Sequence, residues 1–217
     1  MDRHPDPGVG VLFPRIETAR LRLRAFRLAD AATVQRLAGD RQVAEGTLLP
    51  HPYEGGTARA WIWNQALAYA AGNSIDFAIE RTEDGALAGA IGLEIDRVGA
   101  CGKLGYWLGR EYWGCGYATE AVNAVLGYGF AVLELERIWA PRFRWNAASA
   151  RVLQKAGLAQ EGRRREYVAA RAREETIETH GILRWEWEER RRPQGVAPVA
   201  PAALHPDAGH ARTGSFG

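Results

Sequence analysis

Cysteine is scarce in this sequence, and long apolar runs are missing. The two cysteines, Cys101 and Cys115, form neither a disulfide framework nor the paired spacing of a zinc site, so we expect no bound metal. No stretch approaches the ~18 uninterrupted apolar residues that a membrane-spanning helix needs. The N-terminal sequence MDRHPDPGVG lacks the apolar core of a signal peptide. These absences predict a reduced, cytoplasmic protein that does not enter a membrane.

Lysine is also scarce and stands only at positions 103 and 155. Arginine therefore carries nearly all of the positive charge. This bias, with abundant alanine and glycine, is typical of coding-composition bias, so it does not predict direct nucleic-acid binding. The 217 residues, of which 47% are hydrophobic and 25% charged, fit one globular domain with extensions. We expect a flexible segment over residues 1–14, the domain over 15–190, and a disordered, proline-rich tail over 191–217.

Hydrophobic periodicity predicts a chain in which strands and helices are mixed. We expect helices over residues 31–38, 57–71, 118–129 and 147–156, and strands over 21–25, 75–80, 87–95, 104–108, 136–140, 158–168 and 174–185. Prolines and glycines predict a loop over 41–56, and Pro141 is expected to end the strand before it. Two arginine-rich stretches, at 20–24 and 163–165, are interpreted as solvated faces. The strands between 75 and 108 predict an antiparallel meander, and strand 136–140 should lie parallel to strand 104–108.

The most informative stretch is GYWLGREYWGCGYATE, residues 105–120. A predicted strand leads into a loop that holds Gly114 and Gly116, and a helix follows. This order is typical of phosphate sites, because glycines let the backbone N–H groups approach an anion and the helix N-terminus carries partial positive charge. A simple turn between a strand and a helix would have the same glycines, so the loop alone leaves both interpretations open.

Four motifs occur together in one order. They are RIETARLRLRAF, GYWLGREYWGCGYATEA, NAASARVLQKAGL and TIETHGILRWEW. Over about residues 15–187 this combination resembles the GNAT superfamily of N-acetyltransferases, in the branch of the ribosomal-protein alanine acetyltransferases RimJ and RimL. The resemblance implies an α+β fold. Its central sheet is mixed, mostly antiparallel, with six to seven strands, a splayed parallel pair and about four flanking helices.

The resemblance also implies an enzyme that moves acetyl from acetyl-CoA to a primary amine. The pantetheine arm would lie between the splayed strands, a backbone N–H near Leu108 would polarise the thioester, and the loop would hold the pyrophosphate. The residues implied to contact acetyl-CoA are Trp107, Leu108, Gly109, Gly114, Cys115, Gly116, Tyr117, Ala118, Thr119, Asn146 and Ser149. The family's Gln or Arg before the glycines is Glu111 here, and we expect this carboxylate to point to solvent.

Catalytic roles are implied for a few polar residues. Ser149 would donate a proton or hydrogen bond to the leaving thiolate, and Asn146 would cap its helix, contact pantetheine, or do both. The general base remains open among Glu94, Asp96 and His180, each of which has the alternative of an ordinary strand residue. Lys155 is interpreted as structural or as a weak phosphate contact.

The acceptor is left open between a protein N-terminal amine and a small-molecule amine, with a homodimer as one possible assembly. A rival hypothesis is a non-catalytic acyl-CoA-binding or regulatory domain, which would keep Gly114 and Gly116 without needing Ser149 or a base. A dinucleotide-binding module is a second rival, but it requires a parallel, doubly wound sheet. The predicted antiparallel meander argues against it.

Overall fold

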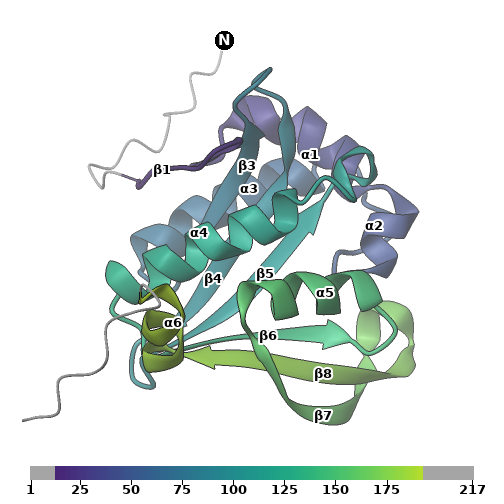
Figure 1. Ribbon diagram of the computed structural model, residues 1–217. Helices are drawn as coiled ribbons and strands as arrows, with labels where there is room; N and C mark the ends of the chain where they lie inside the picture. The colour runs from purple at the N-terminus through teal and green to yellow at the C-terminus, as the bar shows by residue number, and fades with distance from the viewer. Residues whose placement is uncertain (1–12, 193–217) are drawn as a thin grey trace, which may run out of the picture.

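Eight strands form one sheet in the order β1-β2-β3-β4-β5-β6-β8-β7 within residues 13–192, the part of the chain that the computed structural model describes (Figure 1). They are β1 (Ile16–Glu17), β2 (Leu21–Arg24), β3 (Ser74–Arg81), β4 (Leu87–Asp96), β5 (Cys101–Leu108), β6 (Arg137–Phe143), β7 (Ala159–Val168) and β8 (Arg173–Leu183). Every neighbouring pair is antiparallel except β5 and β6. The expected mixed sheet is confirmed, with eight strands instead of six to seven, and a doubly wound parallel sheet is excluded.

Helices cover both faces of the sheet. They are α1 (Ala31–Ala38), α2 (Arg41–Glu45), α3 (Thr57–Ala70), α4 (Tyr117–Ala131), α5 (Ala147–Ala156) and α6 (Arg184–Arg191). The α4 face holds the larger core, where Phe77, Leu93 and Leu126 pack together, whereas α1 and α3 pack on the opposite face against Ala78 and Ala90. None of the helices within the described residues has the length and apolarity of a membrane span. Residues 1–12 and 193–217, most of the predicted flexible segment and tail, lie outside the described part.

Two helices were not predicted. The expected loop 41–56 contains α2, which begins because Asp40 Oδ1 accepts hydrogen bonds from the backbone N–H groups of Gln42 and Val43 at 2.8 and 3.4 Å. The last strand was expected to reach Trp185, but it ends at Leu183 and α6 follows. Glu186 accepts a hydrogen bond from the Leu183 N–H at 2.8 Å, which stabilises the first turn of α6.

Strand β6 continues through Pro141, so the expected break there was wrong. The N–H of Arg144 donates to Thr176 of β8 at 2.8 Å, and antiparallel backbone groups alternate in direction along a strand. The nitrogen of Pro141, three residues earlier, therefore points away from β8. On that side β5 has already diverged, so the missing N–H costs no ladder hydrogen bond.

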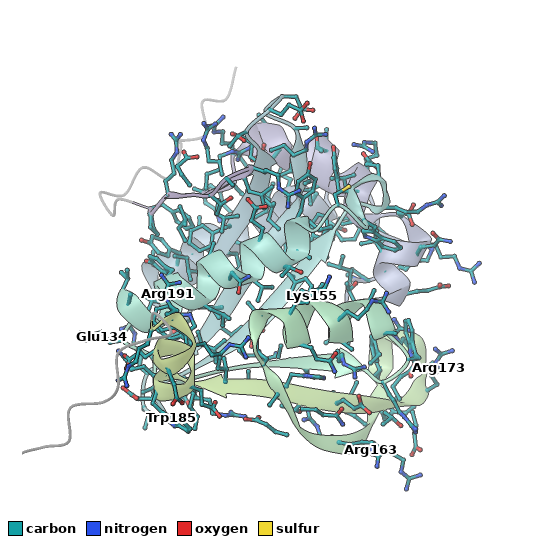
Figure 2. All side chains as sticks on the ribbon, in the orientation of Figure 1. Glu134, Lys155, Arg163, Arg173, Trp185 and Arg191 are labelled. Atoms are coloured by element: carbon teal, nitrogen blue, oxygen red, sulfur yellow. The ribbon has the colours of Figure 1, made fainter. Side chains whose placement is uncertain are left out.

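The predicted solvated arginine face at 20–24 is wrong for Arg24, whereas Arg20 is exposed and Arg22 is half-buried. Arg24 is only 7% exposed and pairs with Glu80 at 2.5 Å and with Asp30 at 2.7 Å. Arg22 pairs with the same Glu80 at 2.6 Å, so this carboxylate links two neighbouring guanidinium groups across β2 and β3. The prediction is confirmed for residues 163–165, which are exposed on β7, and Arg163 lies on the outer side of the β7–β8 hairpin (Figure 2).

The parallel pair β5–β6 is splayed, as expected. Pairing is confined to Cys101–Lys103 of β5 and Arg137–Trp139 of β6, and the two strands diverge beyond it (Figure 1). The sheet therefore has a gap between its two halves, with the start of α4 on one side and the start of α5 on the other. This gap positions the candidate site.

Candidate active site

Backbone groups of β5 point into the gap. The N–H of Gly109 donates to the carbonyl of Ala88 at 2.9 Å, so Gly109 belongs to a hydrogen-bonded pair with β4. Because such pairs alternate along an antiparallel ladder, the backbone groups of Leu108 and Tyr106 face the other way, toward β6. The Leu108 carbonyl accepts a hydrogen bond from Trp113 Nε1 at 2.9 Å. The N–H of Leu108 therefore points into the gap, where it can polarise a carbonyl.

The glycine loop leads directly into the start of α4. Gly114 and Gly116 have φ values of +77° and +83°, in the left-handed region that favours glycine. A Cβ on Gly114 would meet no atom within 4 Å, so this position needs glycine for its backbone conformation and not for lack of space. Gly116 is the N-cap of α4, and the following N–H groups form an anion site with the positive end of the helix dipole.

Arg20 holds this loop in place, although the sequence pattern suggested a solvated arginine. Its Nη1 donates to the carbonyl of Cys115 at 2.9 Å, and its guanidinium lies 4.8 Å from the centre of the Tyr117 ring. It also forms an ion pair with Glu120 at 2.7 Å. The Glu120 carboxylate accepts a further hydrogen bond from the Thr18 hydroxyl at 2.7 Å. Partial burial opposes the charge on Glu120, but these hydrogen bonds from Thr18 and Arg20 lower its pKa. The loop is thus fixed from the β1–β2 turn.

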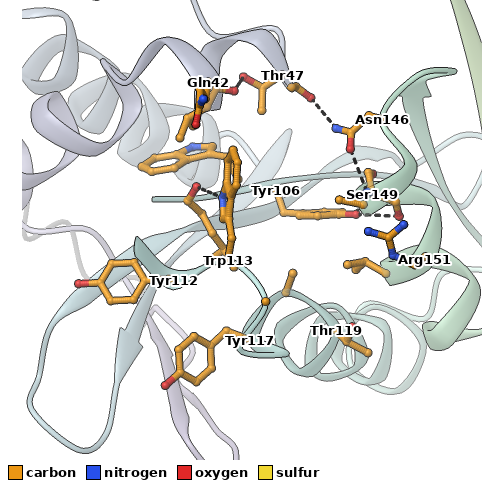
Figure 3. A pocket seen from close by; sticks show the side chains of 18 of the residues that line it. Gln42, Thr47, Tyr106, Tyr112, Trp113, Tyr117, Thr119, Asn146, Ser149 and Arg151 are labelled. Atoms are coloured by element: carbon orange, nitrogen blue, oxygen red, sulfur yellow. Dashed lines mark hydrogen bonds between the residues drawn. The ribbon is translucent and has the colours of Figure 1, made fainter. Parts of the chain in front are cut away.

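Ser149 faces Tyr106 across the gap. The two hydroxyl oxygens are 2.9 Å apart, so α5 and β5 are joined by a side-chain hydrogen bond (Figure 3). Burial raises the pKa of Tyr106 to about 12, despite the hydrogen bond with Ser149 and the nearby positive charge of Arg142. Tyr106 therefore stays protonated at physiological pH and can donate to Ser149 while the serine donates to a third group.

Asn146 caps α5, and its amide is used at both ends. Its Oδ1 accepts a hydrogen bond from the Ser149 N–H at 3.0 Å, which confirms the predicted cap, and its Nδ2 donates to the Gly46 carbonyl at 3.1 Å (Figure 3). The second contact fixes a short segment, residues 44–47, that includes the end of α2 and the turn after it. We call this segment the strap, because it crosses the gap between the α3 and α5 sides.

The first cavity, of about 550 Å³, lies between the strap, β5 and the starts of α4 and α5. Nine of the eleven residues predicted to contact acetyl-CoA line it: Trp107, Leu108, Gly114, Gly116, Tyr117, Ala118, Thr119, Asn146 and Ser149. Gly109 and Cys115 do not, since Gly109 lies against Leu37 and the exposed Cys115 sulfur turns toward the Trp113 carbonyl. Glu111 pairs with Arg36 at 3.0 Å, and Lys155 lines the cavity from α5 beside α4 (Figure 2).

A family model described as an acetyltransferase (GNAT) domain matches residues 20–159. The chain belongs to the GNAT acetyltransferase family. It is 33% identical over 158 residues to the uncharacterized N-acetyltransferase YoaA of Bacillus subtilis. The aligned residues cover 72% of this chain and 89% of that protein. It is 30% identical over 173 residues to the uncharacterized N-acetyltransferase p20 of Bacillus licheniformis, with 78% and 96% covered. These matches identify the chain as an acyltransferase.

Solved structures share the fold of this acetyltransferase. A GNAT-family acetyltransferase from Bacillus anthracis matches with a TM-score of 0.72 at 24% identity. The match covers 79% of this chain and 99% of that chain. The ribosomal-protein-S5-alanine acetyltransferase from Vibrio fischeri matches with a TM-score of 0.70 at 20% identity, covering 80% and 98%. These structures therefore confirm the GNAT fold that the motifs suggested.

A second cavity of about 850 Å³ lies on the α3 face of this acetyltransferase and meets the first beneath the strap. Both cavities are lined by Gly46, Thr47, Tyr106, Trp107 and Ser149. The strap is held from the far side by Arg171, which donates to the carbonyls of Ala44, Glu45 and Thr47 and stacks 4.2 Å from the centre of the Phe143 ring. The strap thus separates two openings that lead to one point at Tyr106 and Ser149.

The three candidate bases occupy different places. Glu94 lines the second cavity, where it pairs with Lys103 at 3.0 Å and its side chain is 69% exposed. Asp96 lies beyond the cavity, and its Oδ1 accepts the N–H groups of Val98 and Gly99 at 3.1 and 3.0 Å. His180 is fully buried in β8, where its Nε2 accepts a hydrogen bond from Arg142 Nε at 3.0 Å. Burial and the charge of Arg142 lower the pKa of His180, so its imidazole is neutral.

Sequence reasoning missed Asp76, which also lines the second cavity. Burial raises the pKa of this carboxylate to about 6, with the Ser74 hydroxyl acting against the shift and Glu94 adding to it. A signal was present in the sequence, since Asp76 is an acidic residue flanked by the apolar residues Ile75 and Phe77 in the first half of β3. Within the described residues no group of three or more His, Cys, Asp or Glu side chains is arranged to hold a metal ion.

Proposed function

We propose that this enzyme transfers acetyl directly from acetyl-CoA to a primary amine, without an acyl-enzyme. The observation that carries the proposal is the direction of the Leu108 N–H, which points into the gap between the glycine loop and the Ser149–Tyr106 pair. One backbone donor, one anion site and one hydroxyl hydrogen-bond donor are the groups that acyl transfer from a phosphate-bearing thioester requires.

The first cavity is the proposed acetyl-CoA site. Gly114 and Gly116 leave their backbone N–H groups accessible, so the loop and the first turn of α4 would hold the pyrophosphate. The arm would run along the open edge of β5 toward Leu108. No side-chain cation is required in the loop, and Glu111 is directed toward Arg36 instead. Asn146 already uses both ends of its amide, which favours a positioning role through α5 and the strap.

The second cavity is the proposed acceptor site. The amine would approach Leu108 from the α3 face, and the Leu108 N–H would stabilise the charge that develops on the carbonyl oxygen. Ser149 would donate a hydrogen bond to the departing thiolate while Tyr106 donates a hydrogen bond to Ser149, and the thiolate would take its proton from water. Most of the rate gain would come from holding the two reactants in the gap, since correct placement alone is worth ~7–11 kcal/mol of the barrier.

Glu94 is the better placed of the predicted bases. It is the one of the three that lines the acceptor cavity, but its register partner Lys103 lies five residues from Leu108, so the amine's proton would reach it only along a chain of waters. Asp96 fixes a turn outside the cavity. For His180 we propose positioning, because its Nε2 lone pair already accepts the Arg142 hydrogen bond, and Arg142 also pairs with Glu178.

The test is release of free thiol from acetyl-CoA in the presence of a panel of primary amines and peptides with free N-termini. Turnover with any of them, together with a mass increase of the amine by one acetyl group, is the expected result. Binding of CoA by calorimetry with no turnover of any amine would instead support a non-catalytic acyl-CoA-binding domain.

A further inference from the structure

Three positions on the α3 face of the sheet lie in register across three strands. Asp76 of β3 pairs with Gly92 of β4, and Gly92 pairs with Gly105 of β5. The neighbouring row on one side carries Trp107, and the row on the other side carries the Glu94–Lys103 ion pair. The floor of the acceptor cavity is therefore lowest over the two glycines, and we call this part, from Gly105 to Asp76, the trough.

The trough ends at the Asp76 carboxylate, which lies over β4. A Cβ on Gly92 would collide with Asp76 Oδ1, so glycine at position 92 makes the room that the carboxylate occupies. Asp76 Oδ2 accepts a hydrogen bond from Ser74 Oγ at 3.0 Å. With the Gln65 amide nitrogen turned toward it, Oδ2 also accepts from Gln65 at 2.6 Å, and the Gln65 oxygen accepts from Trp61 Nε1 at 2.7 Å. These α3 side chains close the end of the trough.

The carboxylate has no cationic partner within residues 13–192. The nearby ammonium of Lys103 is paired with Glu94, and no ion pair is formed by Asp76 in the described part of the chain. A largely buried carboxylate without a cation is costly, and its pKa is raised accordingly. Such a group in a substrate cavity is typical of a functional role, in which the missing positive charge comes from the ligand.

Distance separates two possible roles for Asp76. Strands lie ~4.8 Å apart and rise ~3.3 Å per residue, so the carboxylate over Gly92 is ~11 Å from the Leu108 N–H, one strand across and three residues along. A general base must come within ~3 Å of the proton that it takes, or act through one water. Asp76 is therefore too far away to deprotonate the reacting amine, but a second positive group on the same acceptor would reach it.

We propose that the acceptor is a small, unbranched amine with a second cationic nitrogen ~11 Å from the reacting one, which the Asp76 carboxylate binds at the end of the trough. This inference rests on the proposed function and specifies its substrate. The closed end favours a chain that stops there over a polypeptide, which would have to lead back to solvent. The indole of Trp107, along one side of the trough, suits an alkyl chain that carries positive charge.

The experiment compares unbranched α,ω-diamines of increasing length with monoamines of equal length, by kcat/KM for thiol release. We expect the preferred diamine to exceed its matched monoamine at least tenfold. Asp76→Asn should lower this ratio about tenfold, whereas Glu174→Gln, an exposed carboxylate on β8 that does not line the cavity, should leave it unchanged. Gly105→Ala should also lower the diamine rate, and it should fold normally because its Cβ would meet no atom within 4 Å.

The outcomes separate this inference from the function on which it rests. Turnover of monoamines or peptides with no preference for diamines would overturn the inference and leave the acetyltransferase function standing. An unchanged diamine-to-monoamine ratio in a folded Asp76→Asn variant would do the same. Absence of turnover with every amine would overturn both.

Discussion

The hydroxyl of Tyr106 lies 2.9 Å from Ser149 Oγ and joins β5 to α5 across the gap. The pair predicts a shared effect on catalysis. Ser149→Ala should lower kcat by about 10–100-fold with little change in the KM for acetyl-CoA, because the interaction matters when the thiolate departs. Tyr106→Phe should have a smaller effect, and the double variant should be little worse than Ser149→Ala alone. Wild-type kcat in a folded Ser149→Ala variant would contradict this role, and steady-state thiol release measures it.

The glycine loop can be tested with a matched control. Gly114→Val should weaken CoA binding at least tenfold, because a side chain at φ +77° strains the loop and covers its N–H groups. Gly85→Val places the same side chain at φ +71° in the β3–β4 hairpin, where a Cβ also meets no atom within 4 Å. Both variants should lose ~1–2 kcal/mol of stability. Only Gly114→Val should show a weaker CoA affinity in calorimetry. Equal CoA affinity in the two variants would remove the loop from the binding site.

Asp76 should lower the stability of the free enzyme at neutral pH. Burial raises its pKa to about 6, from an ordinary value near 4, so the folded state binds more protons between these two pH values. Stability is then greatest, as far as this group is concerned, below pH 4, and it falls as pH rises through 6. Asp76→Asn should therefore raise the free energy of unfolding by on the order of 1–3 kcal/mol above pH 6, with no gain below pH 4. Urea unfolding of both proteins at pH 4 and pH 8 measures this difference in the free energy of unfolding. A variant less stable than the wild type at pH 8 would contradict the prediction.

Arg171 should control the order of the strap. Arg171→Met removes the hydrogen bonds to the carbonyls of Ala44, Glu45 and Thr47 and the contact with Phe143. Hydrogen exchange at residues 44–47 should accelerate, and the KM for the acceptor should rise several-fold, since the strap lines the acceptor cavity. The control is Arg173→Met, an exposed arginine on the same hairpin that pairs with Glu175. Equal hydrogen-exchange rates at residues 44–47 in the two variants would show that Arg171 does not order the strap. The contact with Asn146 alone would then hold it.

Much of the fold could be predicted from local sequence patterns. The helix Ala147–Ala156 was placed with its observed limits, because an Asn cap and a glycine stop mark both ends. The splayed parallel pair was also expected from the motifs. Where prediction failed, contacts between distant parts of the chain decide the structure. Pro141 remains in a strand because its neighbour has diverged, and Arg24 is buried because Glu80 and Asp30 surround it.

The candidate site shows the same division. Nine of eleven predicted contacts line the first cavity, since one continuous motif supplies most of them. Arg20, Arg171 and Asp76 were missed, because each acts on a segment far away in the sequence. Arg20 reaches a carbonyl 95 residues later, and Asp76 depends on the register of three strands. No local pattern contains that register, although an aspartate between two apolar residues of a strand is a sign of a buried carboxylate.

The strap has a kinetic consequence. Because the strap lies between the proposed acetyl-CoA and acceptor cavities, which share the lining at Gly46, Thr47, Tyr106, Trp107 and Ser149, each substrate would have its own route to the site. With this assignment neither substrate would obstruct the entry of the other, and the acetylated product would depart while CoA is still bound. The enzyme should accordingly show a random order of addition, with intersecting lines in initial-velocity plots and no compulsory first partner.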